Sequence, residues 1–155
     1  MILTEQELVR WGERIGREVA PPVLLALRGP LGAGKSVLAR AVARGAGVEG
    51  PLPSPTFNLL FRYEGAVADV VHVDLYRIHD IQELEELGWE ELIAGEEILL
   101  VEWPERAGGL IPDDRWEVEL RVHQAGADLR EVLVRRVGAP PALPAFPMTV
   151  APERP

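Results

Sequence analysis

The segment 29–36, with the sequence GPLGAGKS, restricts the possible folds of this chain more than any other feature. It matches the pattern G-x-x-x-x-G-K-[ST], in which glycines let the main chain curl so that its N–H groups point at phosphate oxygens. The lysine, Lys35, reaches the terminal phosphates, and the hydroxyl of Ser36 is a Mg²⁺ ligand in such loops. Lys35 is the only lysine in the chain, which favours a specific use for an ammonium group here.

The sequence around this loop predicts the strand–loop–helix unit that the pattern requires. Residues 23–27 form a short, continuous apolar run, typical of a strand that is covered on both faces of a sheet. From Ser36, small and branched apolar residues alternate with arginines until Gly45 and Gly47, as in a helix with a C-terminal stop. The positive end of that helix dipole would face the phosphates.

The rest of the pattern predicts an α/β, P-loop NTPase-like fold with three layers. We expect a mostly parallel central sheet, with antiparallel strands added at an edge. Thr4 and Glu7 form a capping-box pattern before an amphipathic helix that ends at Pro21. Further segments are predicted as a hairpin (57–63 and 67–73), a helical stretch from residue 80, a buried strand (98–101) and an antiparallel pair (116–122 and 129–134).

Two acidic residues are predicted to complete the phosphate site, because each follows an apolar strand. Asp74 follows residues 70–73, and Glu102 follows residues 98–101. Carboxylates at neighbouring strand ends can hold Mg²⁺ and the attacking nucleophile. Thr56 lies in a loop where related folds keep a hydroxyl that contacts the γ-phosphate. We therefore expect nucleotide contacts from Gly29, Leu31, Gly32, Ala33, Gly34, Lys35, Ser36, Val37 and Thr56.

We expect Lys35, Asp74 and Glu102 to be the catalytic residues and Ser36, Glu102 and Asp74 to lie at the metal. The preferred arrangement places Ser36 and Glu102 near Mg²⁺ and lets Asp74 orient or deprotonate water. The sequence leaves open whether Asp74 or Glu102 is the metal residue. The three histidines lack metal-ligand spacing, so we expect them to be core or surface residues.

Composition excludes several classes of protein. The formal net charge of −9 disfavours direct contact with nucleic acid or anionic membranes. The absence of cysteine excludes disulfides, thiolate metal sites and thiol nucleophiles. No segment is apolar enough for a membrane span, and we expect a cytoplasmic protein. A length of 155 residues fits one ATPase domain over residues 1–137, followed by a proline-rich tail, 138–155, expected to be flexible.

Four motifs, in order, resemble those of the TsaE (YjeE) family, the ATPase component of bacterial tRNA threonylcarbamoyladenosine biosynthesis. They are GPLGAGKS, SPTFNLL with Tyr63, HVDLYR and VEWPER, and the resemblance covers about residues 3–122. It implies that residues 54–56 form a switch-like loop, that Asp74 is a Walker B-like aspartate, and that Glu102 is a second acidic residue of hydrolysis, with Trp103 beside it. Ser36 stands where the family usually has threonine, which preserves the hydroxyl.

The resemblance also implies ATP, ADP and Mg²⁺ as ligands, and TsaB and TsaD as partners that contact tRNA on behalf of this chain. Hydrolysis is then expected to be weak in isolation and stimulated by the partners. A small P-loop kinase that phosphorylates a nucleotide or metabolite is the main alternative, since the same loop serves phosphoryl transfer. A nucleotide-gated binding module is another, whereas a GTPase lacks support because the guanine-reading N-K-x-D motif is missing.

Overall fold

A computed structural model describes residues 1–52 and 59–145. Within these residues the strands form one seven-stranded sheet in the order β1-β7-β6-β2-β5-β4-β3. The central pairs β6–β2, β2–β5 and β5–β4 are parallel, and antiparallel strands lie at both edges of the sheet. The strands are β1 (Ile2–Thr4), β2 (Val23–Arg28), β3 (Leu60–Tyr63), β4 (Val70–Asp74), β5 (Ile98–Glu102), β6 (Arg115–Val122) and β7 (Leu129–Val137).

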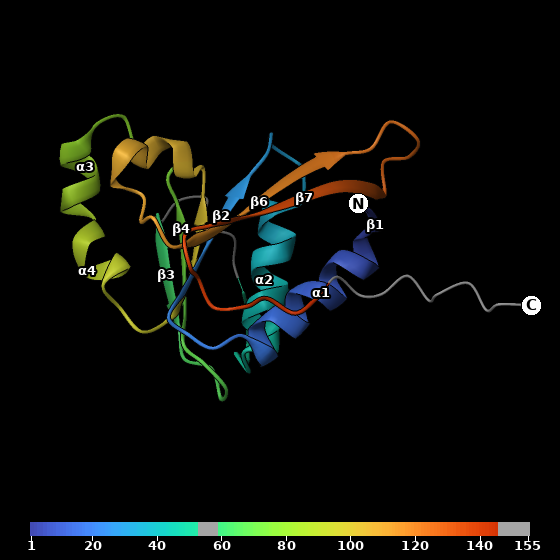
Figure 1. The fold of residues 1–155 in the computed structure, drawn as a ribbon, viewed down its shortest axis with the longest axis horizontal. Coiled ribbons are helices and arrows are strands. Elements are labelled where there is room, and N and C mark those ends of the chain that lie inside the picture. Colours follow the sequence, from blue (N-terminus) through green and yellow to red (C-terminus); the bar gives the residue numbers. More distant parts are fainter. Residues whose placement is uncertain (53–58, 146–155) are drawn as a thin grey trace, which may run out of the picture.

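Helices cover the two faces of the sheet, which confirms the predicted three-layer α/β class (Figure 1). One face carries α1 (Glu5–Glu18) and α2 (Lys35–Gly45). The other carries α3 (Ile81–Glu86), α4 (Trp89–Ile93) and the 3₁₀ segment η1 (Pro104–Leu110). The predicted hairpin is the antiparallel pair β3–β4, and the predicted C-terminal pair is β6–β7. Strand β1 was not predicted from the sequence; it pairs with β7 and lies immediately before the capping box of α1.

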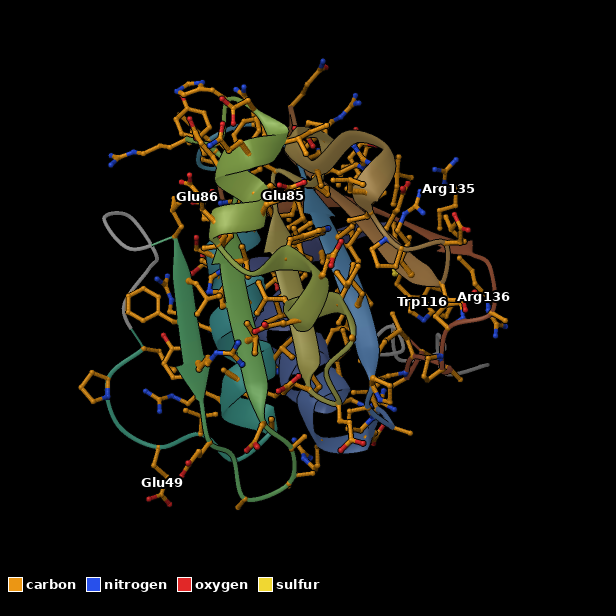
Figure 2. The ribbon with its side chains drawn as sticks, turned by 90° about the vertical axis from the view of Figure 1, so that its left-hand side faces the viewer. Glu49, Glu85, Glu86, Trp116, Arg135 and Arg136 are labelled. Carbon is orange, nitrogen blue, oxygen red and sulfur yellow. The ribbon has the colours of Figure 1, made fainter. Side chains whose placement is uncertain are left out.

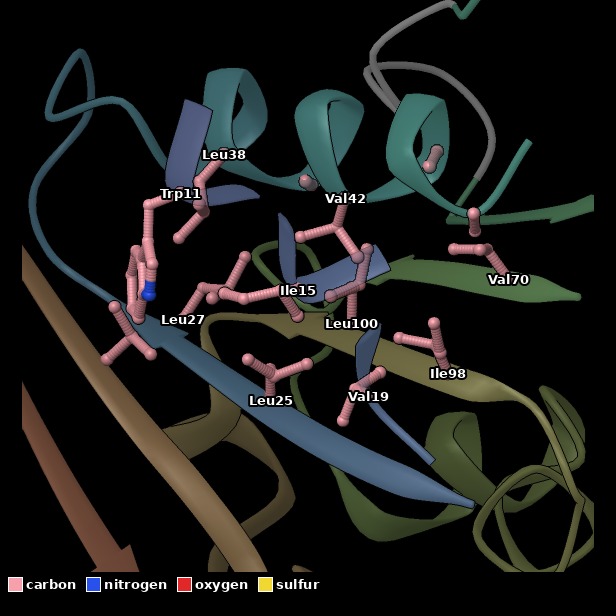
Figure 3. Packing of buried hydrophobic residues seen from close by; sticks show 14 of the residues in the cluster. Trp11, Ile15, Val19, Leu25, Leu27, Leu38, Val42, Val70, Ile98 and Leu100 are labelled. Atoms are coloured by element: carbon pink, nitrogen blue, oxygen red, sulfur yellow. The ribbon is translucent and has the colours of Figure 1, made fainter. Parts of the chain in front are cut away.

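The alternation of residues along the central strands divides the core in two. On β5, Ile98 and Leu100 face α1 and α2, whereas Leu99 and Val101 face the other layer. Figure 3 shows the first cluster, in which Trp11 and Ile15 of α1 lie against the sheet. Because β2, β4 and β5 are apolar on both faces, their positions in the sheet are strongly specified. The carboxyl ends of these strands therefore fix the positions at which the following loops begin.

Helices α1 and α2 cross at very short range because glycines line their contact. A Cβ atom on Gly16 would collide with the carbonyl oxygen of Val42, and one on Gly45 would collide with the carbonyl oxygen of Glu13. This close contact fixes α2, and so the loop at its N-terminal end, relative to the rest of the α1 layer.

The first part of the proline-rich segment lies against the domain. Trp116 donates its indole N–H to the carbonyl oxygen of Pro141 at 2.7 Å, and Trp11 donates to that of Pro144 at 3.1 Å. Leu143 packs against the core cluster beneath α1. Residues 139–145 thus cover two large aromatic side chains, and residues 146–155 lie outside the described part of the chain. Among residues 1–52 and 59–145, every helix is too short or too polar to cross a lipid bilayer.

We predict that Gly16→Ala destabilises the fold by about 1–3 kcal/mol, the usual cost of inserting a methyl group into a tightly packed contact. Gly109→Ala is the matched control, since a Cβ there meets no atom within 4 Å. Thermal denaturation should show a lower Tm for Gly16→Ala and an unchanged Tm for Gly109→Ala. Equal melting temperatures for both variants would contradict the close packing of α1 on α2.

Candidate active site

The loop between β2 and α2 is the centre of the candidate site. Gly34 precedes α2 in the left-handed conformation (φ 106°), and α2 begins at Lys35 without a side-chain cap. The first backbone N–H groups of a helix have no partner within it, so those at this end of α2 can bind an anion. Gly29 has a positive φ of 141°, which favours glycine. A Cβ at this position would also collide with the carbonyl oxygen of Leu120. The loop is therefore pressed against β6 at one end and opens into a cavity at the other.

The cavity has a volume of about 370 Å³ and brings together most of the predicted site residues. Residues 31–37 of the loop and the two carboxylates, Asp74 and Glu102, all line this cavity. Gly29 lies just outside the lining, where its carbonyl accepts a hydrogen bond from Lys35. Thr56 is the exception, because residues 53–58 lie outside the described residues. Trp103, which the family resemblance placed beside Glu102, also lines the cavity. The remaining lining residues, which sequence reasoning did not place in the site, are Leu59, Tyr76, Arg77 and Arg130.

Sheet register explains why the two carboxylates meet. Leu27 at the end of β2 pairs with Glu102 on β5, and Glu102 pairs with Asp74 on β4. The three strands are parallel and adjacent, so their carboxyl ends lie in one row beside the loop. The backbone N–H of Leu75 also donates to the carbonyl of Glu102 at 3.0 Å, which ties the turn after β4 to the end of β5.

Ser36 and Glu102 are in direct contact. The Ser36 hydroxyl lies 3.2 Å from each carboxylate oxygen of Glu102, whose side chain is almost fully buried. Since an ionised carboxylate can only accept, the hydroxyl is the donor. The contact joins the first turn of α2 to β5, so a ligand bound to either residue would also be within reach of the other.

His72 is a site residue that the sequence predicted only as a core or surface residue. Its ring nitrogen Nε2 lies 2.6 Å from Oε2 of Glu102, and both side chains are at most 4% exposed. His72 and Asp74 are two positions apart on β4, with only Val73 between them, so both side chains point to the same face of the strand. This spacing is the feature of the sequence that could have predicted the contact, because Glu102 lies on the same face of the sheet, on the adjacent strand β5. His72 holds the carboxylate in place below Ser36.

Lys35 is buried between the loop and Trp103. Its ammonium group donates to the carbonyl oxygens of Gly29 and Pro30, the latter at 3.0 Å, and lies 4.2 Å from the centroid of the Trp103 ring. Burial lowers the pKa of Lys35 from its usual 10.5, and the negative charges of Glu102 and Asp74 act in the opposite direction. A phosphate group would add to that second effect, because a nearby negative charge favours the charged form.

Trp103 stands directly after Glu102 with a left-handed backbone (φ 57°). This conformation is uncommon for a bulky residue. It lets the indole contact both Lys35 and Tyr76, whose ring centroid is 5.0 Å away. The aromatic pair therefore forms the part of the cavity wall nearest the lysine.

Comparisons with known proteins assign the chain to a family. A family model described as "Threonylcarbamoyl adenosine biosynthesis protein TsaE" matches residues 2–132. The chain belongs to the TsaE family. The resemblance predicted from the four motifs is thereby confirmed.

Individual relatives agree with this assignment. The chain is 33% identical over 129 residues to the tRNA threonylcarbamoyladenosine biosynthesis protein TsaE of Treponema pallidum, covering 83% of this chain and 93% of that protein. It is 36% identical over 118 residues to the Bacillus subtilis protein of the same name, covering 76% and 72% of the two chains. The crystal structure of Bacillus subtilis YdiB matches with a TM-score of 0.73 and 25% identity, covering 89% and 84%.

We predict that Asp74→Asn raises the Tm at neutral pH. Burial raises the pKa of Asp74, the N–H of Tyr76 opposes this, and the negative charge of Glu102 raises it further. The pKa of Asp74 is higher in the folded chain than in the unfolded chain, where it is about 3.9. The favourable contribution of the protonated side chain to folding is therefore complete below the unfolded pKa. It is lost as the pH rises through the folded pKa. At neutral pH the ionised side chain therefore costs stability, which asparagine removes.

Thermal denaturation at neutral pH and near pH 4 is the measurement. A change of about 1 kcal/mol shifts the Tm of a domain of this size by about 2–4 °C, so an effect of that order is measurable. The gain should shrink at the lower pH. Glu85→Gln, on the exposed face of α3, is the charge-matched control and should leave the Tm unchanged. A lower Tm for Asp74→Asn at neutral pH would contradict the unfavourable burial of this charge.

Proposed function

We propose that this protein binds and hydrolyses Mg²⁺-ATP in support of threonylcarbamoyl transfer to a tRNA adenosine, together with TsaB and TsaD. The observation that carries the proposal is the contact between the loop and the strand ends. Lys35 and Ser36, at the start of α2, share one cavity with Asp74 and Glu102, and Ser36 touches Glu102. The assignment to tRNA modification rests on the family and on the printed names of its relatives.

The phosphates would bind to the main chain of residues 32–37 and to Lys35. The N–H groups of the first turn of α2 have no acceptor within the helix and can serve as donors, and the helix dipole adds positive potential. Lys35 is buried against Trp103 and already lies within the loop, so its ammonium group needs little rearrangement to reach a phosphate. A charge that is already positioned in this way lowers the cost of reorganisation when the ligand binds.

The donor set fits Mg²⁺. Ser36 and Glu102 offer a hydroxyl and a carboxylate side by side, with Asp74 on the adjacent strand, and Mg²⁺ prefers oxygen ligands of this type. In the described residues no group of three or more His, Cys, Asp or Glu could hold a metal by itself. This suits an ion that arrives with its nucleotide, since Mg²⁺ takes few protein ligands and keeps phosphates and waters. When bound, it would neutralise charge on the β- and γ-phosphates.

The contacts favour separate roles for the two carboxylates. Glu102 is held by Ser36 on one side and by His72 on the other, which suits a residue at the metal. Asp74 is half-buried with a raised pKa, so it accepts a proton more readily than an ordinary aspartate. In hydrolysis, the oxygen of a water attacks the γ-phosphorus, the bond to the β-bridging oxygen breaks, and Asp74 receives the proton of that water.

The net charge of −9 supports the indirect contact with tRNA. An acidic protein is repelled by a phosphate backbone, so tRNA is best held by the partners. Partner binding would also explain a slow isolated enzyme, because P-loop enzymes gain much of their rate once the γ-phosphate is fully surrounded.

The proposed function predicts different defects for three substitutions. Lys35→Ala should abolish or strongly weaken ATP binding, because it removes the only ammonium group in the loop. Asp74→Ala and Glu102→Ala should retain most binding but lose hydrolysis by about 10²-fold or more, as expected for groups that act on the reacting atoms. Fluorescent-nucleotide binding and phosphate release, each with and without TsaB and TsaD, are the measurements.

Arg121→Gln is the control, since this exposed side chain lies on β6 outside the cavity and pairs with Glu119. It should behave like the wild type in both assays. Equal loss of binding and hydrolysis in all three site variants would contradict the separate roles. Phosphate transfer to an added nucleotide or metabolite, instead of release into water, would favour the kinase alternative.

A further inference from the structure

Arg130 is one of the cations that line the cavity, and its strand, β7, lies on the other side of β2 from the strands of the two carboxylates. Arg130 lies near the start of β7, next to the turn of the β6–β7 hairpin, and lines the cavity that contains the loop. Its Nε atom is 3.5 Å from the position that a Cβ on Gly34 would occupy. The side chain therefore reaches across to the main chain immediately before Lys35.

The hairpin holds this side chain in place. Nη1 donates to the carbonyl oxygens of Ala127 and Leu129, the latter at 3.2 Å. The ion pairs between described residues do not include Arg130, and its hydrogen bonds to them use Nη1 alone. Arginine has five N–H donors in a planar fork, so Nε and Nη2 can still bind an anion. This differs from Arg115 and Arg135, which bind the buried carboxylate of Glu117.

Strand order shows which part of a nucleotide Arg130 would meet. Asp74 and Glu102 lie on β4 and β5, to one side of β2, whereas Arg130 lies on β7, beyond β6 on the other side. If the γ-phosphate and the metal face the carboxylates, the chain of phosphates must run across the loop away from them. Its other end, with the α-phosphate and the nucleoside, then faces β6 and β7. The carboxylates of Asp74 and Glu102 would repel an α-phosphate, which the metal ion does not screen there. The guanidinium group of Arg130 would attract it.

We propose that Arg130 binds the α-phosphate of the nucleotide. This inference rests on the proposed nucleotide binding and adds the residue that holds the nucleoside end of the ligand. Arg130 thus contributes to the binding affinity for ADP and for ATP alike. Lys35, in contrast, serves the terminal phosphates.

Calorimetric titration with Mg²⁺-ADP and Mg²⁺-ATP tests this. Arg130→Gln should weaken both nucleotides by a similar factor of about tenfold to a hundredfold, the usual effect of losing a charge-assisted hydrogen bond. Arg130→Lys should recover part of the affinity, since it restores the charge without the planar fork. It also provides a second variant if glutamine disturbs the hairpin. Arg121→Gln loses the same charge from the exposed face of β6 and should bind both nucleotides like the wild type.

Unchanged affinity in Arg130→Gln would overturn the inference, and so would a loss confined to ATP, which would place this side chain at the γ-phosphate. A wild-type protein that binds neither nucleotide would overturn the proposed function itself. Melting temperatures without nucleotide separate binding from folding. The inference requires the affinity loss to appear in a variant whose Tm matches that of Arg121→Gln.

Discussion

The structure depends on the parallel alignment of β2, β5 and β4. Because Leu27, Glu102 and Asp74 share one row of the sheet, the glycine-rich loop after β2 faces two carboxylates, and these lie where Ser36 can touch one of them. The strands hold this register because both of their faces are apolar and covered by helices. Shifting any one strand by a residue would turn its core side chains to the wrong layer. The geometry of the site is thus a consequence of core packing.

Around this row the side chains form a continuous set of polar contacts inside an apolar domain. His72 holds Glu102, Glu102 accepts from Ser36, and Lys35 is packed against Trp103 and the loop carbonyls. In the cavity lining, both acids stand at the ends of β4 and β5, with Arg77 shortly after β4, and Arg130 lies on β7. Figure 2 shows Glu85 and Glu86 on α3 well apart from Arg135 and Arg136 on β7. Trp116, near Arg136, belongs to the contact that fixes residues 139–145.

Much of this arrangement could be predicted from sequence because it depends on local patterns. The loop, its flanking strand and helix, and the acidic residues that end β4 and β5 are each visible as short motifs. His72 and Arg130 were not assigned to the site, since their importance comes from pairing between distant segments. The short strand β1 was missed because three residues give no periodicity, and its place is decided by pairing with β7. The binding of residues 139–145 depends on two indole groups far away in sequence, which proline content alone does not reveal.

In the proposed function, this row of groups binds a nucleotide through its magnesium-chelated phosphates. The most direct measurement is calorimetric titration of the wild-type protein with ATP, first with Mg²⁺ and then with excess chelator. We expect a clear heat of binding with Mg²⁺ and a weaker affinity without it, because Ser36 and Glu102 then lose the ion between them and the phosphates. Equal affinity in both conditions would contradict the role of these oxygen ligands, and no heat in either would contradict nucleotide binding altogether.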